Sequence, residues 1–88
     1  MAAPHGLSPD EYAQWINARI GAEVRARREA LGMSAYALGR AGGASDQTIL
    51  NIERGACLNG SLTGTLARVC VRFGLTLSEL IAAAERRG

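Results

Sequence analysis

Two side-chain amides, Gln47 and Asn51, lie one helical turn apart in the segment from Ser45 to Arg54. A carboxamide offers one hydrogen-bond donor and one acceptor in a plane, and this pair matches the edge of an adenine base. The same residues could also form the solvated face of an ordinary helix. The two amides therefore indicate base recognition only if the fold presents them on an exposed helix.

The segment from Met33 to Gly55 predicts two short helices joined by a tight turn. Ser34 can cap the first helix and Ser45 the second, because a serine oxygen accepts hydrogen bonds from the free N–H groups at a helix start. Gly43 can adopt the left-handed backbone of the turn, and the small Gly39 lets the helices cross closely. A helix presented in this way can enter the major groove of DNA.

Further helix signals lie on both sides of this segment. A helix starts at the segment Ser8-Pro9-Asp10-Glu11 and runs to about Leu31. The sequence does not decide whether this helix bends or breaks near Gly21. Residues 62–73 predict a fourth helix, and a capping box from Thr76 to Glu79 starts a fifth. No stretch alternates with period two, so we expect no strands. The inward residues are predicted to be Ile16, Ile20, Val24, Leu31, Ile49, Ile52, Leu66, Val69, Cys70, Phe73, Leu77, Leu80 and Ile81.

The predicted fold is therefore all-α, a five-helix bundle with an extended N-terminal helix. We expect a flexible N-terminus over residues 1–8 and a single domain over residues 9–84, with the helix-turn-helix unit at about 34–54. Residues 85–88 are expected to form a polar tail.

Composition limits the possible functions without choosing one. The chain has 88 residues, of which 48% are apolar and 20% charged, which is typical of one small folded domain. No apolar run is long enough to cross a membrane, and the first residues lack the features of a secretory signal, so we expect a cytoplasmic protein. The net charge of +2 permits nucleic-acid binding without requiring it.

Metal and catalytic chemistry have little support in the sequence. Cys57 and Cys70 show no metal-binding spacing, and His5 is the only histidine. We expect the two cysteines to be reduced, with a single disulfide as the alternative, and a redox-sensing role for Cys57 is open. The sequence contains no recognisable set of nucleophile, base and orienting group, so we predict no enzyme, no metal and no cofactor.

Taken in order, these elements resemble the Xre-like family of helix-turn-helix domains, the phage repressor and Cro type, over roughly residues 19 to 82. The matching pieces are Ile20-Gly21-x-x-Val24-Arg25-x-x-Arg28, Leu31-Gly32-Met33-Ser34-x-x-x-Leu38, Gly43-x-Ser45-x-x-Thr48-Ile49-x-x-Ile52-Glu53-Arg54-Gly55, and Leu66-x-x-Val69-x-x-x-Phe73-Gly74-Leu75-x-x-x-Glu79-Leu80. The resemblance implies a phage-repressor bundle that binds double-stranded DNA with its third helix.

Carried over by position, the resemblance implies base contacts from the third helix and an ion pair between Arg28 and Glu53. Asp46 can accept from a cytosine or stabilise the helix dipole. Leu50 faces outward, where it can touch a thymine methyl group, join a protein-binding surface or be an isolated exposed apolar residue. The base-contact candidates are Asp46, Gln47, Thr48, Leu50 and Asn51.

Four residues are candidates for phosphate contacts: Ser34, Arg40, Ser45 and Arg54. Hydroxyl and guanidinium groups make such contacts, but the serines also act as caps, and Arg40 can be an ordinary surface residue. Arg19, Arg25 and Arg27 could add positive charge if they face the DNA, which their spacing leaves open.

A domain of this size reads few base pairs, so we expect a homodimer on a palindromic operator. Tyr12 and Trp15 are one candidate interface, because large aromatic residues are enriched at interfaces, although they can also cap the core. The resemblance implies a second candidate in the last helix, around Leu77 and Ile81.

Two departures from the family pattern favour a different function. Ala35 replaces a glutamine that commonly follows the Ser34 position, and the loop of residues 56–60 carries no charge. Fewer cations mean weaker binding to phosphates. The alternative is therefore a protein–protein interaction module on the same fold with weak DNA affinity.

Overall fold

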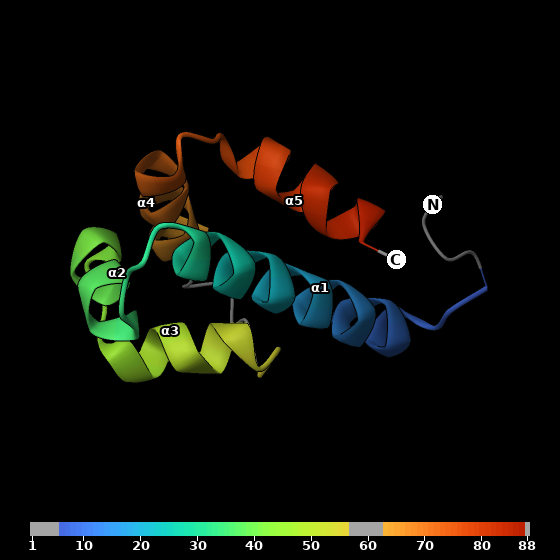
Figure 1. The fold of residues 1–88 in the computed structure, drawn as a ribbon. Helices are drawn as coiled ribbons and strands as arrows, with labels where there is room; N and C mark the ends of the chain where they lie inside the picture. The colour runs from blue at the N-terminus through green and yellow to red at the C-terminus, as the bar shows by residue number, and fades with distance from the viewer. Residues whose placement is uncertain (1–5, 57–62, 88) are drawn as a thin grey trace.

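The computed structural model describes residues 6–56 and 63–87, and within these ranges it contains five helices and no strand (Figure 1). The prediction of an all-α, five-helix fold is confirmed. No helix of the described ranges is long and apolar enough to cross a membrane. The helices are α1 (Pro9–Ala30), α2 (Ala35–Gly42), α3 (Asp46–Glu53), α4 (Thr63–Phe73) and α5 (Leu77–Arg86).

Four helices begin at a side-chain cap that the sequence identifies. The hydroxyl groups of Ser8, Ser34, Ser45 and Thr76 each accept a hydrogen bond from a backbone N–H three residues later. At Ser8 and Thr76 a glutamate also accepts from the cap backbone, which completes a capping box. These local interactions fix where α1, α2, α3 and α5 begin.

The bend considered at Gly21 does not occur, since α1 is continuous from Pro9 to Ala30. Gly21 instead allows α1 to approach α3 closely. A β-carbon at this position would collide with the carbonyl oxygens of Ile52 and Glu53. The absence of a side chain therefore sets the distance between α1 and the helix that carries Gln47 and Asn51.

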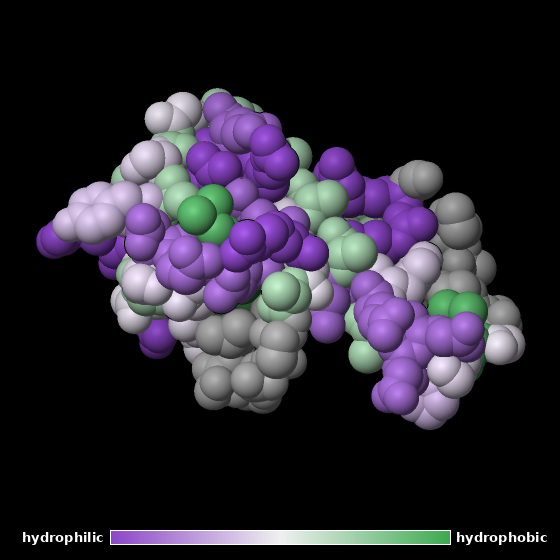
Figure 2. Space-filling view, turned by 90° about the horizontal axis from the view of Figure 1, so that it is seen from below, coloured by the Kyte–Doolittle hydropathy of each residue, from purple (hydrophilic) through white to green (hydrophobic). Residues whose placement is uncertain are grey.

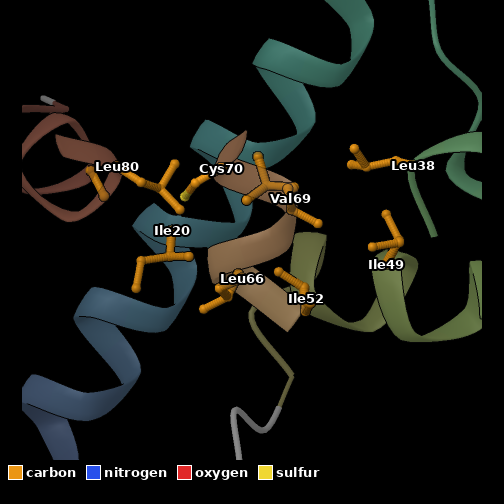
Figure 3. Packing of buried hydrophobic residues seen from close by; sticks show 10 residues of the cluster. Ile20, Leu38, Ile49, Ile52, Leu66, Val69, Cys70 and Leu80 are labelled. Carbon is orange, nitrogen blue, oxygen red and sulfur yellow. The ribbon is translucent and has the colours of Figure 1, made fainter. Parts of the chain in front are cut away.

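One hydrophobic core joins all five helices (Figure 3). Val24, Leu38, Ile49, Ile52 and Leu80 are fully buried. Most predicted inward residues are buried in this cluster or packed against it. The core holds α1 between α3 and α5, while α2 packs against both α3 and α4.

The prediction that Leu31 is a core residue is wrong, because its side chain is 47% exposed. Leu31 is the C-cap of α1 and lies where the helix ends. It lines a shallow hollow with Arg27, Ala30 and Phe73 rather than filling the core. The helical phase points Leu31 inward, but the core does not extend to this end of α1.

The C-terminal residues continue the fold. α5 extends through Arg86, so two residues of the expected polar tail are helical. Arg87 then donates to the Glu23 carboxylate at 2.7 Å, and Arg27 donates to the same carboxylate at 2.7 Å. Burial favours the neutral form of Glu23, but these two hydrogen bonds outweigh it and lower the pKa of Glu23. The end of the chain is thereby held against α1.

Candidate nucleic-acid interface

α2 and α3 form a helix-turn-helix unit and cross at a steep angle (Figure 1). Gly43 adopts the left-handed backbone at the turn, with φ of 68°. The Ala44 N–H donates to the Gly39 carbonyl at 2.8 Å, and a β-carbon at Gly39 would lie only 2.8 Å from the Ala44 oxygen. Both glycines therefore serve the turn in the way that the sequence predicts.

A contact from α4 supports the same turn. The Arg68 Nε donates to the Gly42 carbonyl at 2.8 Å, so it satisfies a carbonyl group at the end of α2. Gly42 also packs against α4, where a β-carbon would lie 2.9 Å from Val69 Cγ2. α4 thus fixes the end of α2 and, through the turn, the start of α3.

The amides of α3 lie on its exposed side and bond to each other. Gln47 Nε2 donates to Asn51 Oδ1 at 3.0 Å, and an Arg54 guanidinium nitrogen donates to the same oxygen at 2.5 Å. Gln47 and Arg54 are exposed, and Asn51 is half-buried. The three side chains therefore form an ordered polar row along α3, within the described part of the chain.

The first turn of α3 holds three other candidates by short-range hydrogen bonds. Asp46 Oδ1 accepts from the Gln47 N–H at 2.9 Å. Ser45 Oγ accepts from the Thr48 N–H at 3.1 Å and lies 3.1 Å from the Thr48 hydroxyl oxygen. These contacts satisfy the helix start, which agrees with the dipole role considered for Asp46.

Leu50 borders a solvent-open hollow between α1 and α3. The hollow has a volume of about 240 Å³ and is lined by Arg25, Arg28, Leu50, Glu53 and Arg54. Leu50 is 38% exposed, as its helical phase predicts. The Arg28 guanidinium is paired with Glu53 in the same hollow, so the positive charge beside Leu50 comes from Arg54 and from Arg25, which pairs with exposed Glu29.

Arg28 and Glu53 form a two-pronged pair that joins α1 to α3. Arg28 Nε lies 2.6 Å from one Glu53 oxygen, and a second guanidinium nitrogen lies 3.0 Å from the other. Arg28 also donates to the Met33 carbonyl at 2.9 Å, which fixes the connection into α2. The hydrogen bonds to Glu53 raise the pKa of Arg28 above its ordinary value.

The candidates for phosphate contact lie at two places. Ser34 caps α2 by accepting from the Ala37 N–H at 3.0 Å. In the last turn of the same helix, the Arg40 guanidinium lies 5.9 Å from the ring centroid of Tyr36. Arg54 lies at the other end of the unit, beside Asn51. Ser34, Arg40 and Arg54 are all exposed, so a phosphate can reach each of them.

The three arginines of α1 that the sequence leaves undecided have separate positions. Arg25 lines the hollow beside α3 and pairs with Glu29 at 3.2 Å. Arg27 pairs with the buried Glu23 and is held there. Arg19 lies over the ring of Trp15. Only Arg25 of these three therefore adds positive charge beside the exposed side of α3.

The two candidate interfaces differ in how the fold uses them. Leu77 and Ile81 are half-buried and pack against the core. Tyr12 is 40% exposed, and its ring stacks on Trp15 with centroids 5.8 Å apart. Trp15 is half-buried, and within residues 6–56 and 63–87 neither ring belongs to the hydrophobic cluster.

Of the two cysteines, Cys70 lies in the described part of the chain. Cys70 is buried in the core, and this burial raises the pKa of its thiol. Cys57 lies outside the described residues, as does His5. Within those ranges, no group of three histidine, cysteine or acidic residues could hold a metal ion.

The face of the molecule on the α3 side is largely hydrophilic, with small hydrophobic spots (Figure 2). Leu50 is the exposed large hydrophobic residue that the described part of α3 contributes. The surface around the polar row is therefore suited to a polar ligand and is not a broad apolar patch.

One comparison with known proteins, that of the structure, found a similar protein. No family model and no curated protein matches the sequence. The structure is similar to the crystal structure of the clp gene regulator ClgR from Corynebacterium glutamicum, with a TM-score of 0.69 and 25% sequence identity. The match covers 78% of this chain and 71% of that chain. The chain thus shares its fold with a gene regulator.

Three residues lie beside the helix-turn-helix unit in positions that the sequence does not predict. Arg68 supports the turn from 26 residues away, and no local pattern marks that contact. Tyr36 is 60% exposed and lies beside Arg40, and no sequence pattern marks this single aromatic residue of a short helix. Arg25 is marked only by its spacing on α1, which does not say what it faces.

Proposed function

We propose that this protein is a sequence-specific DNA-binding transcriptional regulator of the Xre-like type, which acts in the cytoplasm as a homodimer on a palindromic operator. The observation that carries the proposal is the exposed polar row of Gln47, Asn51 and Arg54 on the second helix of a helix-turn-helix unit. The likeness to a protein described as a gene regulator supports it.

In this function α3 enters the major groove, and its amides meet the edges of the bases. Gln47 binds an adenine through one donor and one acceptor, and its hydrogen bond to Asn51 holds the amide plane in place. Thr48, Asp46 and Leu50 border the same bases, and Leu50 is placed to touch a thymine methyl group.

The phosphates on each side of the groove are bound by the ends of the unit. Ser34 acts at the start of α2, Arg40 acts in its last turn, and Ser45 acts at the start of α3, where backbone N–H groups also face outward. Arg54 and Arg25 provide positive charge at the other end of α3. These contacts fix the register of the protein on the duplex but do not read its sequence.

The salt dependence of binding to random duplex DNA tests this proposal. Arg25, Arg40 and Arg54 predict about three released counterions per subunit, because each neutralised phosphate lowers the log–log slope by about 0.9. Arg54→Gln should make the slope shallower by about one unit. Arg72→Gln is the matched control, because it removes an equal charge from an exposed position on α4. A flat slope for the unmodified protein would contradict DNA binding.

A second candidate function is a protein–protein interaction module with weak DNA affinity. Two exposed hydrophobic residues favour it. Leu50 is 38% exposed on α3, and Tyr36 is 60% exposed in the first turn of α2. Ala35 and the uncharged loop of residues 56–60, which lies mostly outside the described residues, also favour it. A flat salt response would support this function over the first.

A further inference from the structure

The N-terminal half of α1 carries an ordered aromatic cluster that the core does not use. The rings of Tyr12 and Trp15 stack at 5.8 Å, and the Arg19 guanidinium lies 4.3 Å from the centroid of the Trp15 ring. This end of α1 reaches past α3 (Figure 1). Large aromatic residues are enriched at interfaces, and a cluster that is already ordered loses little side-chain freedom when it binds.

The charged residues on this face are arranged so that they can pair with the same residues of a second copy of the chain. Glu11, Trp15 and Arg19 follow one another at intervals of four residues, so they share one side of α1. The acidic residue lies on one side of Trp15 and the basic residue on the other. In an antiparallel pair of such helices, Glu11 therefore lies opposite Arg19 of the partner subunit, and the contact occurs twice. A twofold interface needs this kind of self-complementary surface.

We propose that this face of α1 binds a second copy of the chain, with the two α1 helices antiparallel and Trp15 on the twofold axis. The inference rests on the proposed function, which needs a dimer but does not say which surface forms it. At the other candidate surface Leu77 and Ile81 pack against the core, whereas Tyr12 is exposed and half-buried Trp15 is outside the described core cluster.

The position of the axis agrees with the geometry of DNA. Gly21 meets Ile52 of α3, and Trp15 lies six residues, or about 9 Å, along α1 from that crossing. Gln47 lies five residues, or about 8 Å, along α3 on the far side of it. α3 runs alongside α1 in the opposite direction (Figure 1). The two Gln47 side chains would then be on the order of 30 Å apart, close to one duplex turn of about 34 Å.

Sedimentation velocity over a range of protein concentrations tests this interface. We expect the unmodified chain to dimerise and Trp15→Ala to weaken the dimer about a hundredfold, since a central tryptophan commonly dominates an interface. Tyr36→Ala removes an exposed aromatic residue from α2 and should leave the dimer intact. Circular dichroism of each variant checks that its helices remain.

A charge reversal separates an interface contact from a folding effect. Arg19→Glu places like charges opposite each other and should weaken the dimer about tenfold. Adding Glu11→Arg to the same chain restores opposite charges across the interface and should recover most of the loss. The double variant also lacks the capping box and the contact with Trp15, so only pairing between subunits explains a recovery.

Three results would overturn the inference: a monomer at all concentrations, a dimer insensitive to Trp15→Ala, or a double reversal without recovery. Sedimentation measures mass and not DNA affinity, so its outcome does not depend on whether α3 binds DNA. A dimer that binds no DNA would contradict the proposed function alone. A monomer that binds a single half-site would contradict the interface and the homodimer, but not base recognition by α3.

Discussion

At the scale of single residues, Gln47 is the side chain on which base recognition most depends. Its amide is exposed, and Asn51 holds one of its N–H groups at 3.0 Å. A side chain that is oriented before binding loses less freedom on meeting a base. Asn51 thus has a positioning role for Gln47 as well as its own capacity to bind.

Replacement of Gln47 by alanine should weaken binding to the preferred operator by roughly 1–3 kcal/mol and relax the preference at one base position. Gln14→Ala removes an exposed amide from α1 and should change neither quantity. Equilibrium binding to a set of operators with single base changes measures both effects. Equal losses on operator and random DNA would instead indicate a structural role for Gln47.

Removal of the Glu53 carboxylate should strongly destabilise the fold. The Arg28 and Glu53 side chains are only 14% and 5% exposed, so Glu53→Ala leaves a buried charge without its partner. We expect a loss of about 3–5 kcal/mol in the free energy of unfolding. Glu29→Ala breaks an exposed pair with Arg25 and should cost less than about 1 kcal/mol. Urea denaturation of both variants makes the comparison, and similar losses would contradict the buried role.

At the scale of helices, the features that can be predicted from the sequence are those that depend on residues close together in the chain. Ser34, Ser45 and Thr76 mark helix starts because a cap bonds to a backbone group three residues away. Gly43 marks the turn because few other residues tolerate its backbone conformation. The whole order of helices follows from such signals together with apolar spacing.

Contacts between residues far apart in the sequence cannot be predicted from the spacing of residue types. Leu31 has the correct helical phase for the core but lies where α1 ends, so no helix covers it. Arg87 meets Glu23 across 64 residues, and Arg68 meets Gly42 across 26. Likewise, spacing alone does not show that Arg25 lies beside α3 while Arg27 points to Glu23.

The variant Gly21→Ala tests whether the stability of the fold depends on the close approach of α1 and α3. In Gly21→Ala the added methyl group meets the backbone oxygens of Ile52 and Glu53, so the helices must separate. We expect a loss of about 1–3 kcal/mol or more in the free energy of unfolding. Gly64→Ala is the control, because its methyl group meets only Arg68 at ordinary contact distance. Thermal unfolding compares them, and a neutral Gly21→Ala would contradict the close crossing.

At the scale of the whole molecule, Glu23 joins the first helix to the end of the chain. Its pKa is lowered in the folded state, so the ionised form stabilises the fold above its usual pKa near 4.3. That stabilisation is lost as the pH falls below about 4 and through the lowered value. Acid should therefore loosen the contact between α5 and α1.

Glu23→Gln tests this pH dependence. The variant should be less stable than the unmodified protein at pH 7 by roughly 1–2 kcal/mol, since two guanidinium groups lose their ionised partner. The difference should shrink as the pH falls below about 4 and through the lowered pKa of Glu23. Urea denaturation at several pH values measures it, with Glu29→Gln as the exposed control. A constant difference across this range would contradict the role of the ionised carboxylate.

Selection of bound sequences from a random pool of duplex DNA tests the central claim most directly, namely that the exposed side of α3 reads bases. We predict enrichment of a palindromic sequence with adenine at a recurring position and half-site centres about 10 base pairs apart. In the same selection, Gln47→Ala should lose the preference at that position. Recovery of random sequence by the unmodified protein would contradict the account.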